Sequence, residues 1–246
     1  MSGEAVRPGF FITLEGPDGS GKSTQTNLLG SALEAAGFAC TVTREPGGTR
    51  LGEAVREILL HSADLAFGPV ADALLFSAAR AQHVTDVIGP ALARGDVVVC
   101  DRFLDSTLVY QGYGAGLSLG SLRELGRFAV GDLAPDMTVL VDLPVDLGLG
   151  RKTGIEVTRF EDRHDIAFHR RVREGFLALA GGEPGRFAVV DGSRPVEAVA
   201  ADVLAAVLPR LERWAGTASR HRPADPRSER ASSESEPERP PQRIER

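Results

Sequence analysis

The segment GPDGSGKS at residues 16–23 constrains what this chain can fold into more than any other stretch. It fits the spacing G-x-x-x-x-G-K-[ST] at every required position. The run before it, residues 10–14, is apolar and rich in aromatic and β-branched residues, which favours a buried strand. Residues 24–36 place leucine and alanine at helical spacing and are followed by Gly37, which favours a helix that ends there. A glycine-rich loop between a strand and a helix is the context in which this spacing binds the phosphates of a nucleoside triphosphate.

Backbone N–H groups and one lysine supply the phosphate contacts in such a loop. Glycine permits backbone conformations in which successive N–H groups point inward, and the helix dipole adds to their effect. We expect Lys22 to reach the β- and γ-phosphates and the Ser23 hydroxyl to coordinate Mg²⁺. A flexible glycine-rich turn is the alternative, but it does not account for the flanking strand and helix. The expected ATP-binding residues are Gly16, Pro17, Asp18, Gly19, Ser20, Gly21, Lys22, Ser23 and Thr24.

Composition excludes several classes of protein. The net charge of −6 argues against a general nucleic-acid binder, which usually carries a basic surface. No apolar run approaches the length of a membrane span, and the N-terminal region lacks a signal-peptide apolar segment, so we expect a cytoplasmic protein without membrane contact. Cys40 and Cys100 lie in apolar, strand-like runs, which favours buried free thiols over a disulfide.

Predicted strands alternate with predicted helices along the chain. This alternation favours a single α/β domain of the three-layer P-loop NTPase type, with a central parallel sheet of about five strands flanked by helices. The strands are expected at residues 10–14, 39–43, 97–100, 137–141 and 187–190, and the helices at 24–36, 51–60, 69–93, 117–130, 166–179 and 196–214. Residues 105–116 form a polar, glycine-rich segment with no helix predicted.

Three stretches are expected to lie outside the compact part of the domain, which we place at residues 10–215. Residues 1–9 are predicted to be a loose leader. Residues 144–165 are dense in charge and poor in regular apolar spacing, which indicates a flexible lid. Residues 216–246 are rich in proline, serine and arginine and hold Ile244 as their only large aliphatic residue, so they are predicted to be a disordered tail.

Asp101 and Arg102 follow the apolar run at residues 97–100. A carboxylate at the end of a buried strand beside a P-loop is the arrangement of a Walker-B aspartate, which holds Mg²⁺ directly or through water. A cap or loop residue is the plainer reading of Asp101. Arg102 is placed to neutralise a phosphate, and its plainer reading is a surface ion pair.

Several motifs together carry a resemblance. Besides the P-loop, the chain holds TREPGGT at residues 43–49 and the residues DRF, ST and YQG within 101–112. Further matches are FSAAR at 76–80 and RFE at 159–161. In these motifs the chain resembles thymidylate kinase (dTMP kinase), of the P-loop nucleoside monophosphate kinase family, over residues 10–214. The P-loop is shared by many families, whereas the other runs are far more restrictive.

The resemblance implies an activity and a set of substrate contacts. It implies transfer of the γ-phosphoryl group of ATP to dTMP, giving dTDP for dTTP biosynthesis, with Mg²⁺ as cofactor and a homodimer as the assembly. Phe76 is implied to stack on thymine, and Arg80 to hydrogen-bond a thymine carbonyl. Tyr110 is implied to crowd a ribose 2′-hydroxyl. The substrate-binding residues that the resemblance implies are Asp18, Arg44, Phe76, Arg80, Arg102, Ser106, Thr107, Tyr110, Gln111 and Glu161.

The charge that builds up on the transferring phosphoryl group needs a further cation. Some thymidylate kinases place a catalytic arginine inside the P-loop and others in the lid. Here residues 17–20 hold no cation, so the lid variant is implied. Arg151 is the first candidate and Arg159 the second, with Lys152 and Arg163 also available. The expected catalytic residues are Lys22, Arg102, Arg151 and Arg159.

Two other functions are compatible with a P-loop. One is a kinase for another nucleotide or a small metabolite, which a panel of acceptors would distinguish. The other is a nucleotide-binding switch. A GTP-dependent switch reads guanine with an Asn-Lys-x-Asp run, and the only asparagine here is Asn27, inside the first predicted helix. The sequence therefore disfavours the switch.

Overall fold

A computed structural model describes residues 9–62, 65, 67–151 and 165–221 of the 246-residue chain. Most of the predicted leader, lid and tail therefore lies outside the described residues. Two parts of these stretches do fall within them. A short helix, α7 (Val145–Arg151), occupies the start of the predicted lid, and the last helix runs to His221, six residues into the predicted tail.

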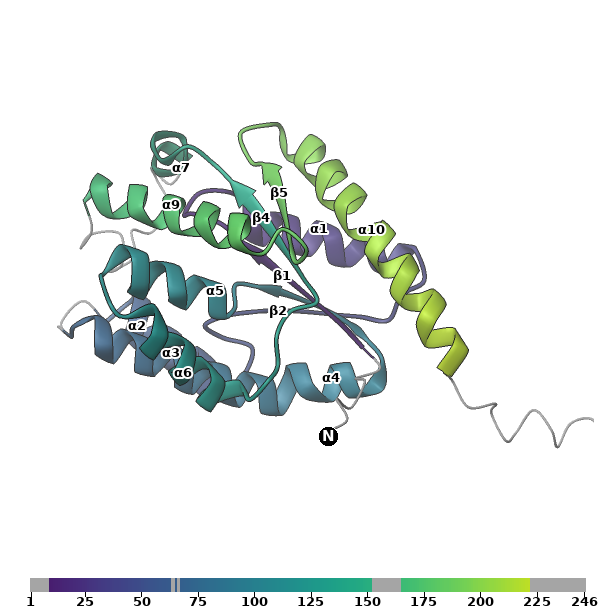
Figure 1. Ribbon diagram of the computed structural model, residues 1–246, viewed down its shortest axis with the longest axis horizontal. Helices are drawn as coiled ribbons and strands as arrows, with labels where there is room; N and C mark the ends of the chain where they lie inside the picture. Colours follow the sequence, from purple (N-terminus) through teal and green to yellow (C-terminus); the bar gives the residue numbers. More distant parts are fainter. Residues whose placement is uncertain (1–8, 63–64, 66, 152–164, 222–246) are drawn as a thin grey trace, which may run out of the picture.

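The centre of the molecule is a five-stranded sheet in the order β2-β3-β1-β4-β5 (Figure 1). Every neighbouring pair is parallel, as the alternation of strands and helices predicts. The strands are β1 (Phe10–Glu15), β2 (Cys40–Arg44), β3 (Val97–Asp101), β4 (Met137–Asp142) and β5 (Phe187–Asp191). The predicted fold class and strand number are confirmed.

The sheet register brings the predicted site residues to one edge. Leu14 in β1 and Arg44 in β2 both pair with Asp101, at the C-terminal end of β3. The central strand β1 lies between β3 and β4. The strands β2 and β3 lie on one side of it and the strands β4 and β5 on the other, so the strand order reverses at β1. Ligands of open α/β sheets bind outside the carboxyl ends of the strands at such a point.

Helices cover both faces of the sheet (Figure 1). Helices α1 and α10 pack on one face, and α4, η2 and α9 cover the other, with α3 and α6 beside them. The helical elements are α1 (Lys22–Ala35), α2 (Arg50–Leu60), α3 (Pro69–His83), η1 (Val84–Ile88), α4 (Gly89–Arg94), α5 (Leu104–Thr107), η2 (Leu108–Gly114), α6 (Leu119–Val130), α7, α9 (Ile166–Gly182) and α10 (Val196–His221).

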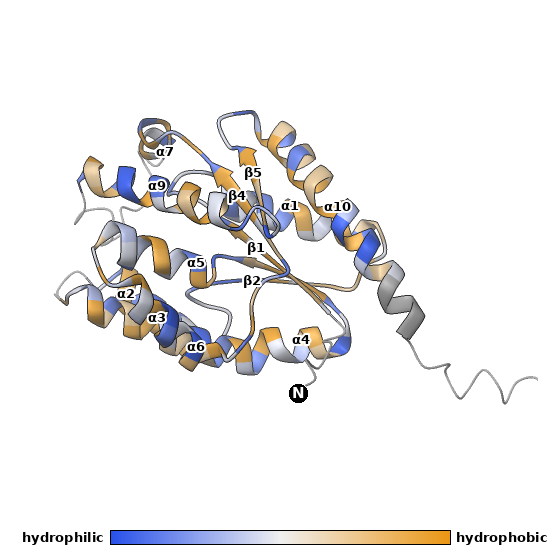
Figure 2. Ribbon diagram, in the orientation of Figure 1, coloured by the Kyte–Doolittle hydropathy of each residue, from blue (hydrophilic) through white to orange (hydrophobic). Residues whose placement is uncertain are grey.

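Alternating side chains of β1 supply both halves of the core. Ile12 and Leu14 are buried against α1 and α10, whereas Phe11 is buried on the opposite face with Ile88 and Phe103. Figure 2 shows the strands as largely hydrophobic and helices such as α9 and α10 as mixed, with both hydrophobic and hydrophilic residues. A sheet buried on both faces explains why its strands read as continuous apolar runs.

The structure corrects one sequence expectation about the elements. Residues 105–116 are not an irregular segment, because α5 and the π-helix η2 follow directly after Phe103. Their polar residues, including Asp105 and Gln111, are buried and face the site or the sheet instead of solvent. The long helix expected at 69–93 is continuous but contains a π-helical segment, η1, between α3 and α4. None of the described helices is both long and apolar enough to cross a bilayer.

Candidate active site

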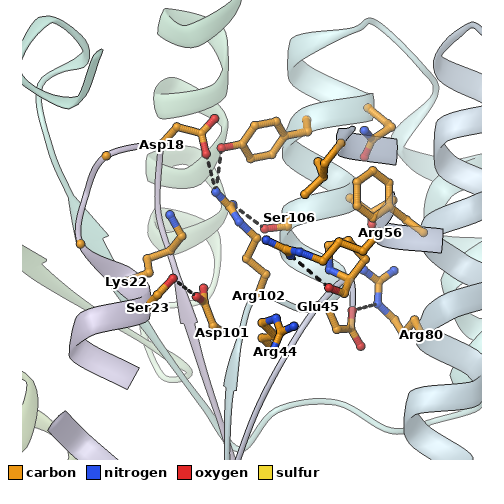
Figure 3. A pocket seen from close by; sticks show the side chains of 18 of the residues that line it. Asp18, Lys22, Ser23, Arg44, Glu45, Arg56, Arg80, Asp101, Arg102 and Ser106 are labelled. Atoms are coloured by element: carbon orange, nitrogen blue, oxygen red, sulfur yellow. Dashed lines mark hydrogen bonds and ion pairs between the residues drawn. The ribbon is translucent and has the colours of Figure 1, made fainter. Parts of the chain in front are cut away.

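A cavity of about 530 Å³ opens at the C-terminal edge of β1, β2 and β3. Its wall combines the end of the P-loop, the loop after β2, helix α3 and the helical segment after β3 (Figure 3). The lining residues are Asp18, Gly19, Gly21, Lys22, Ser23, Thr24, Arg44, Glu45, Pro46, Arg56, Leu60, Phe76, Arg80, Asp101, Arg102, Ser106, Thr107, Tyr110, Gln111 and Arg151. Nearly all of the predicted site residues that the structure describes therefore meet at one place.

The P-loop follows β1 in the predicted strand–loop–helix context, and two of its glycines are required by close backbone contacts. Gly16 and Gly19 have φ angles of 150° and 76°. A Cβ atom at Gly19 would lie 2.1 Å from the carbonyl oxygen of Gly148 in α7. The loop therefore packs directly on the helix that begins the predicted lid.

Lys22 is buried at the first turn of α1, with 6% of its surface exposed. Its Nζ donates to the carbonyl of Pro17 at 2.9 Å and to Ser20 Oγ at 3.4 Å. Burial, together with the nearby charge of Arg102, lowers the pKa of Lys22 to about 8. Gly16, Pro17 and Ser20 do not line the cavity themselves, but Pro17 and Ser20 hold the lysine.

The donor set for Mg²⁺ fits the residues present. Ser23 Oγ donates a hydrogen bond to Asp101 Oδ2, so the two predicted metal ligands lie in direct contact (Figure 3). Asp101 Oδ1 is buried and has no hydrogen-bond partner among the described residues. A buried carboxylate oxygen without a donor is costly, and a hydrated Mg²⁺ ion at this position would remove that cost.

Arg102 is held in an uncommon backbone conformation at the end of β3. Its φ angle is 72°, and it is the sole non-glycine residue with positive φ in the described part of the chain. Nη2 donates to Asp18 Oδ1 at 2.7 Å and to the Tyr110 hydroxyl at 3.1 Å, while Nη1 donates to Ser106 Oγ at 3.0 Å. Burial disfavours its charge, but Tyr110 and Asp18 outweigh burial and raise the pKa of Arg102. Four predicted residues are thus linked in one network (Figure 3).

Glu15, which the sequence reasoning did not select as a site residue, lies beneath this network. Its carboxylate accepts from the backbone N–H of Phe103 at 2.8 Å and from Ser106 Oγ at 2.6 Å. Burial and the nearby Asp105 raise the pKa of Glu15 to about 7. Its place directly before the P-loop glycine is the signal that sequence reasoning had available.

Arg80 and Phe76 share one side of α3, as their spacing of four residues predicts. Arg80 is 1% exposed, and its Nε donates to Glu45 Oε2 at 2.7 Å. Its Nη2 donates to the carbonyl of Phe103 at 3.1 Å. Its Nη1 has no hydrogen-bond partner among the described residues, although the side chain lines the cavity. This N–H pair is therefore suited to a carbonyl oxygen of a ligand.

Two arginines flank the loop after β2. Arg44 lines the cavity but is half-exposed, and its Nη2 donates to both carboxylate oxygens of Glu53, at 2.8 and 2.9 Å. Arg56 also lines the cavity and donates to the carbonyl of Pro46 at 3.1 Å, yet sequence reasoning missed it. Burial and the neighbouring Arg44 lower the pKa of Arg56. Its position next to the buried stripe of α2, which includes Val55, was the available signal.

The predicted lid cations fall into two groups. Arg151, at the end of α7, lines the cavity, and its guanidinium donates to the carbonyls of Gly192 at 2.9 Å and Ser193 at 3.4 Å. The other predicted lid residues, Arg159 and Glu161, lie outside the described residues.

Thr107 and Gln111 are buried and line the cavity beside Tyr110.

The cavity concentrates positive charge in an acidic chain. Its lining includes five arginines and Lys22, against the carboxylates of Asp18, Glu45 and Asp101. The chain as a whole carries a formal charge of −6, so this clustering is local. Several phosphate groups and a divalent cation are the ligands that such a lining stabilises.

Comparison with known proteins gives a consistent result. Residues 14–203 match the family model described as thymidylate kinase. A thymidylate kinase of Thermomicrobium roseum is 53% identical over 206 residues, covering 83% of this chain and 97% of the relative. A thymidylate kinase of Geobacter sulfurreducens is 50% identical over 213 residues, covering 83% of this chain and 99% of the relative. The crystal structure of thymidylate kinase from Ehrlichia chaffeensis matches with a TM-score of 0.65 and 34% identity, covering 81% of this chain and 98% of that chain.

Proposed function

This chain belongs to the thymidylate kinase family, and we propose that the cation-lined cavity at the C-terminal edge of its sheet is the site of its reaction. The reaction is transfer of the γ-phosphoryl group of ATP to dTMP, giving dTDP, with Mg²⁺ as cofactor. The roles of single residues in that reaction are proposals, and those of the described residues are supported by their contacts or by their place in the cavity wall.

The donor half of the site is the P-loop. Backbone N–H groups of the P-loop, to which Pro17 contributes none, bind the phosphates of ATP, and Lys22 contacts the β- and γ-phosphates. The contact between Ser23 and Asp101, with Asp101 Oδ1 left without a protein donor, supports a Mg²⁺ site at these two residues. Ser23 and Asp101 would hold the ion, which would supply positive charge beside the phosphates of ATP.

The acceptor half of the site places the phosphate of dTMP beside Arg102. Arg44 and Arg56 approach the same region from the loop after β2 and from α2 (Figure 3). Asp18, Ser106 and Tyr110 orient Arg102, and Tyr110 also borders the sugar. The acceptor phosphate is already a nucleophile, so the protein needs no covalent intermediate and contributes alignment and neutralisation of charge.

The base pocket lies between α3 and η2. Phe76 stacks on thymine, the free N–H groups of Arg80 Nη1 bind a thymine carbonyl, and Thr107 and Gln111 close the other side. The main support for this base pocket is the buried Arg80, whose Nη1 has no hydrogen-bond partner among the described residues. Leaving such a donor unpaired costs about 1–3 kcal/mol, which a bound carbonyl removes.

Charge on the transferring phosphoryl group is met by Lys22, by the ion and by a lid arginine. Arg151 is the first candidate because it lines the cavity and leads into the predicted lid. Arg159 and Glu161 keep their proposed roles as a second arginine and as a carboxylate near the nucleotide.

One experiment tests the assignment of the substrate. ADP release is measured with dTMP, dUMP, dCMP, dGMP and no acceptor, at fixed ATP and Mg²⁺. Fastest turnover with dTMP and almost none without acceptor is the expected result. Equal rates with several nucleotides would instead indicate a kinase of broader specificity, and fast ADP release without acceptor would indicate an ATPase or a switch.

We also propose a homodimer in the cytoplasm. The packed helices α3 and α6 carry large apolar side chains that the single chain leaves exposed. Leu74 of α3 is 53% exposed and Phe128 of α6 is 90% exposed. A second copy that covers this surface accounts for such exposure better than solvent does.

A further inference from the structure

The geometry points to His83 as a positioning residue for base recognition, which acts through Glu45 to fix the orientation of the Arg80 guanidinium. His83 does not line the cavity. The inference rests on the proposed function, because it takes Arg80 as the residue that binds the thymine carbonyl. It adds a residue behind the pocket that determines how well the base is held.

His83 is a fully buried link between the last turn of α3 and the loop after β2. It is 0% exposed, and its Nδ1 lies 3.0 Å from Glu45 Oε1. Its Nε2 lies 2.6 Å from the hydroxyl oxygen of Thr43. An ionised carboxylate accepts hydrogen bonds and cannot donate them, so Nδ1 carries the hydrogen that faces Glu45.

The space around the imidazole ring is fitted to it. Gly48 has a φ angle of 75°, and a Cβ atom there would lie 2.6 Å from His83 Nε2 and 2.8 Å from Thr43 Oγ1. The glycine therefore leaves room for the ring, and the ring fixes the loop that carries Glu45. Both ring nitrogens have partners, as a fully buried histidine requires.

Glu45 passes this constraint on to Arg80. Its two oxygens are divided between His83, at Oε1, and Arg80 Nε, at Oε2, 2.7 Å away. The pair is buried, because the side chains of Arg80 and Glu45 are 2% and 4% exposed (Figure 3). Phe103 adds a second restraint, since its carbonyl accepts from Arg80 Nη2 and its ring lies 5.4 Å from the guanidinium carbon.

These restraints leave only one nitrogen of the guanidinium for a ligand. With Nε and Nη2 bonded, Nη1 is the group without a protein partner among the described residues. A planar guanidinium aims Nη1 correctly only while the other two nitrogens are held. Loss of the His83 bond frees one Glu45 oxygen, so Glu45 gains an alternative orientation and Arg80 loses its fixed plane. Affinity for the base should then fall, whereas ATP binding at the P-loop should not.

The two ring nitrogens are tested separately by amide substitutions. His83→Asn places an N–H donor near the position of Nδ1, and His83→Gln places one near the position of Nε2. Thr43→Val is the matched control, because it removes the Nε2 partner and leaves the Glu45 bond in place. The apparent KM values for dTMP and ATP and the kcat are measured for each, with circular dichroism and thermal melting to confirm folding.

We expect His83→Gln to raise the KM for dTMP by about tenfold, with less than a twofold change in the KM for ATP. His83→Asn and Thr43→Val should stay within about threefold of wild type for both substrates. Equal rises in both KM values, or a His83→Asn defect as large as that of His83→Gln, would overturn the inference. If His83→Gln does not fold, Glu45→Gln tests the same link from its other end while preserving the shape of the side chain.

A double-mutant cycle then shows whether His83 acts through Arg80. If it does, His83→Gln should add almost nothing to the dTMP defect of Arg80→Ala, because the group that it positions is gone. Additive defects would mean that His83 supports the pocket by another route. If Arg80→Ala alone leaves the KM for dTMP unchanged, the proposed base contact itself is wrong, and that result is distinct from a failure of His83.

Discussion

Lys22 lies where its surroundings oppose its own charge. Burial and Arg102 lower its pKa to about 8, whereas the phosphates of ATP favour the charged form once they are bound. Above pH 8 the free enzyme therefore loses the charge that ATP needs. We expect the KM for ATP to rise by about tenfold per pH unit above that point, with kcat at saturating ATP nearly constant.

The measurement is a series of ATP titrations at saturating dTMP between pH 7 and pH 9.5. Lys22→Arg is the informative control, because a guanidinium keeps its charge throughout this range. If Lys22→Arg retains activity, its KM for ATP should be flat with pH. A flat profile in the wild type would show that Lys22 does not titrate there.

Glu15 links pH to the stability of the acceptor side. Its folded-state pKa of about 7 is raised from 4.5, chiefly by burial and then by Asp105. The folded protein therefore holds this proton more tightly than the unfolded chain does. The resulting stabilisation is complete below about pH 4.5 and is lost as pH rises through about 7.

Glu15→Gln removes this dependence while preserving shape. The unfolding free energy of the wild type relative to Glu15→Gln should fall between pH 4.5 and pH 7, by up to about 3 kcal/mol. Urea unfolding at pH 5, 6, 7 and 8 measures the difference. A difference that stays constant, or one that grows with pH, would contradict the raised pKa.

Arg151 is the one predicted lid cation that falls within the described residues. It donates to the carbonyls of Gly192 and Ser193 and also lines the cavity in which we propose that the phosphates bind. Arg151→Ala should lower kcat by about a thousandfold with little change in the KM for ATP, as expected for a group that acts on the transition state. Steady-state kinetics with Arg159→Ala alongside checks this. If both variants kept the wild-type kcat, neither lid arginine would contribute to the transfer of the phosphoryl group.

Sequence reasoning selected the residues that belong to short motifs. It missed residues such as Glu45 and His83, which contact another site residue from a distant part of the sequence. The P-loop, Asp101 and Arg102 were selected because each belongs to a short motif, and the structure places Lys22, Asp101 and Arg102 in one cavity wall. Glu45 lies inside the TREPGGT motif at 43–49, but its partners Arg80 and His83 are more than 30 residues away in the sequence. These contacts form only when α3 packs against the loop after β2, so no local sequence pattern predicts them.

At the scale of elements, helix α7 packs so closely on the P-loop that neither backbone leaves space for a side chain between them. A Cβ atom at Gly148 would lie 2.5 Å from the carbonyl oxygen of Asp18, which is closer than packed atoms allow. At Gly150, two residues further along the same helix, none of the described residues places a heavy atom within 4 Å of the corresponding position. We therefore expect a glycine-to-alanine substitution to be harmful at position 148 and tolerated at position 150.

Gly148→Ala should push α7, and with it Arg151, away from the P-loop. We expect at least about a tenfold loss in kcat/KM for ATP, because a displacement of about 1 Å at a reacting centre costs up to a hundredfold. Gly150→Ala should be neutral or slightly stabilising, since alanine favours a helix. Both are measured by kinetics and thermal melting. Equal activities in the two variants would show that the contact between α7 and the loop carries no functional weight.

The element that sequence reasoning misjudged lies at the same end of the sheet. Residues 105–116 are polar and glycine-rich, which normally indicates a loop, but they form α5 and η2. Burial explains the difference, because Asp105 pairs with Arg186 at 2.6 Å and Gln111 faces the cavity. Polar residues that serve a buried site do not show the apolar spacing of a surface helix.

At the scale of the whole molecule, the order of strands and helices could be predicted from hydrophobic patterning, whereas the exposed apolar surface of α3 and α6 could not. Five parallel strands were predicted because a sheet buried on both faces needs continuous apolar runs. An exposed Phe128 or Leu74 looks in the sequence like any other apolar residue of a helix. Only the packed structure shows that one face of α3 and of α6 remains uncovered by the single chain.

Phe128→Asp combined with Leu74→Asp should therefore convert the proposed homodimer into a monomer. Each charge would be buried without a partner in the dimer and solvated in the monomer, so association becomes unfavourable while folding is nearly unaffected. Sedimentation equilibrium at micromolar concentration measures the mass. Leu177→Asp, at an exposed apolar position of α9, is the control and should leave the dimer intact. A wild-type chain that sediments as a monomer would refute the dimer, and a double variant that remains dimeric would place its interface on another face.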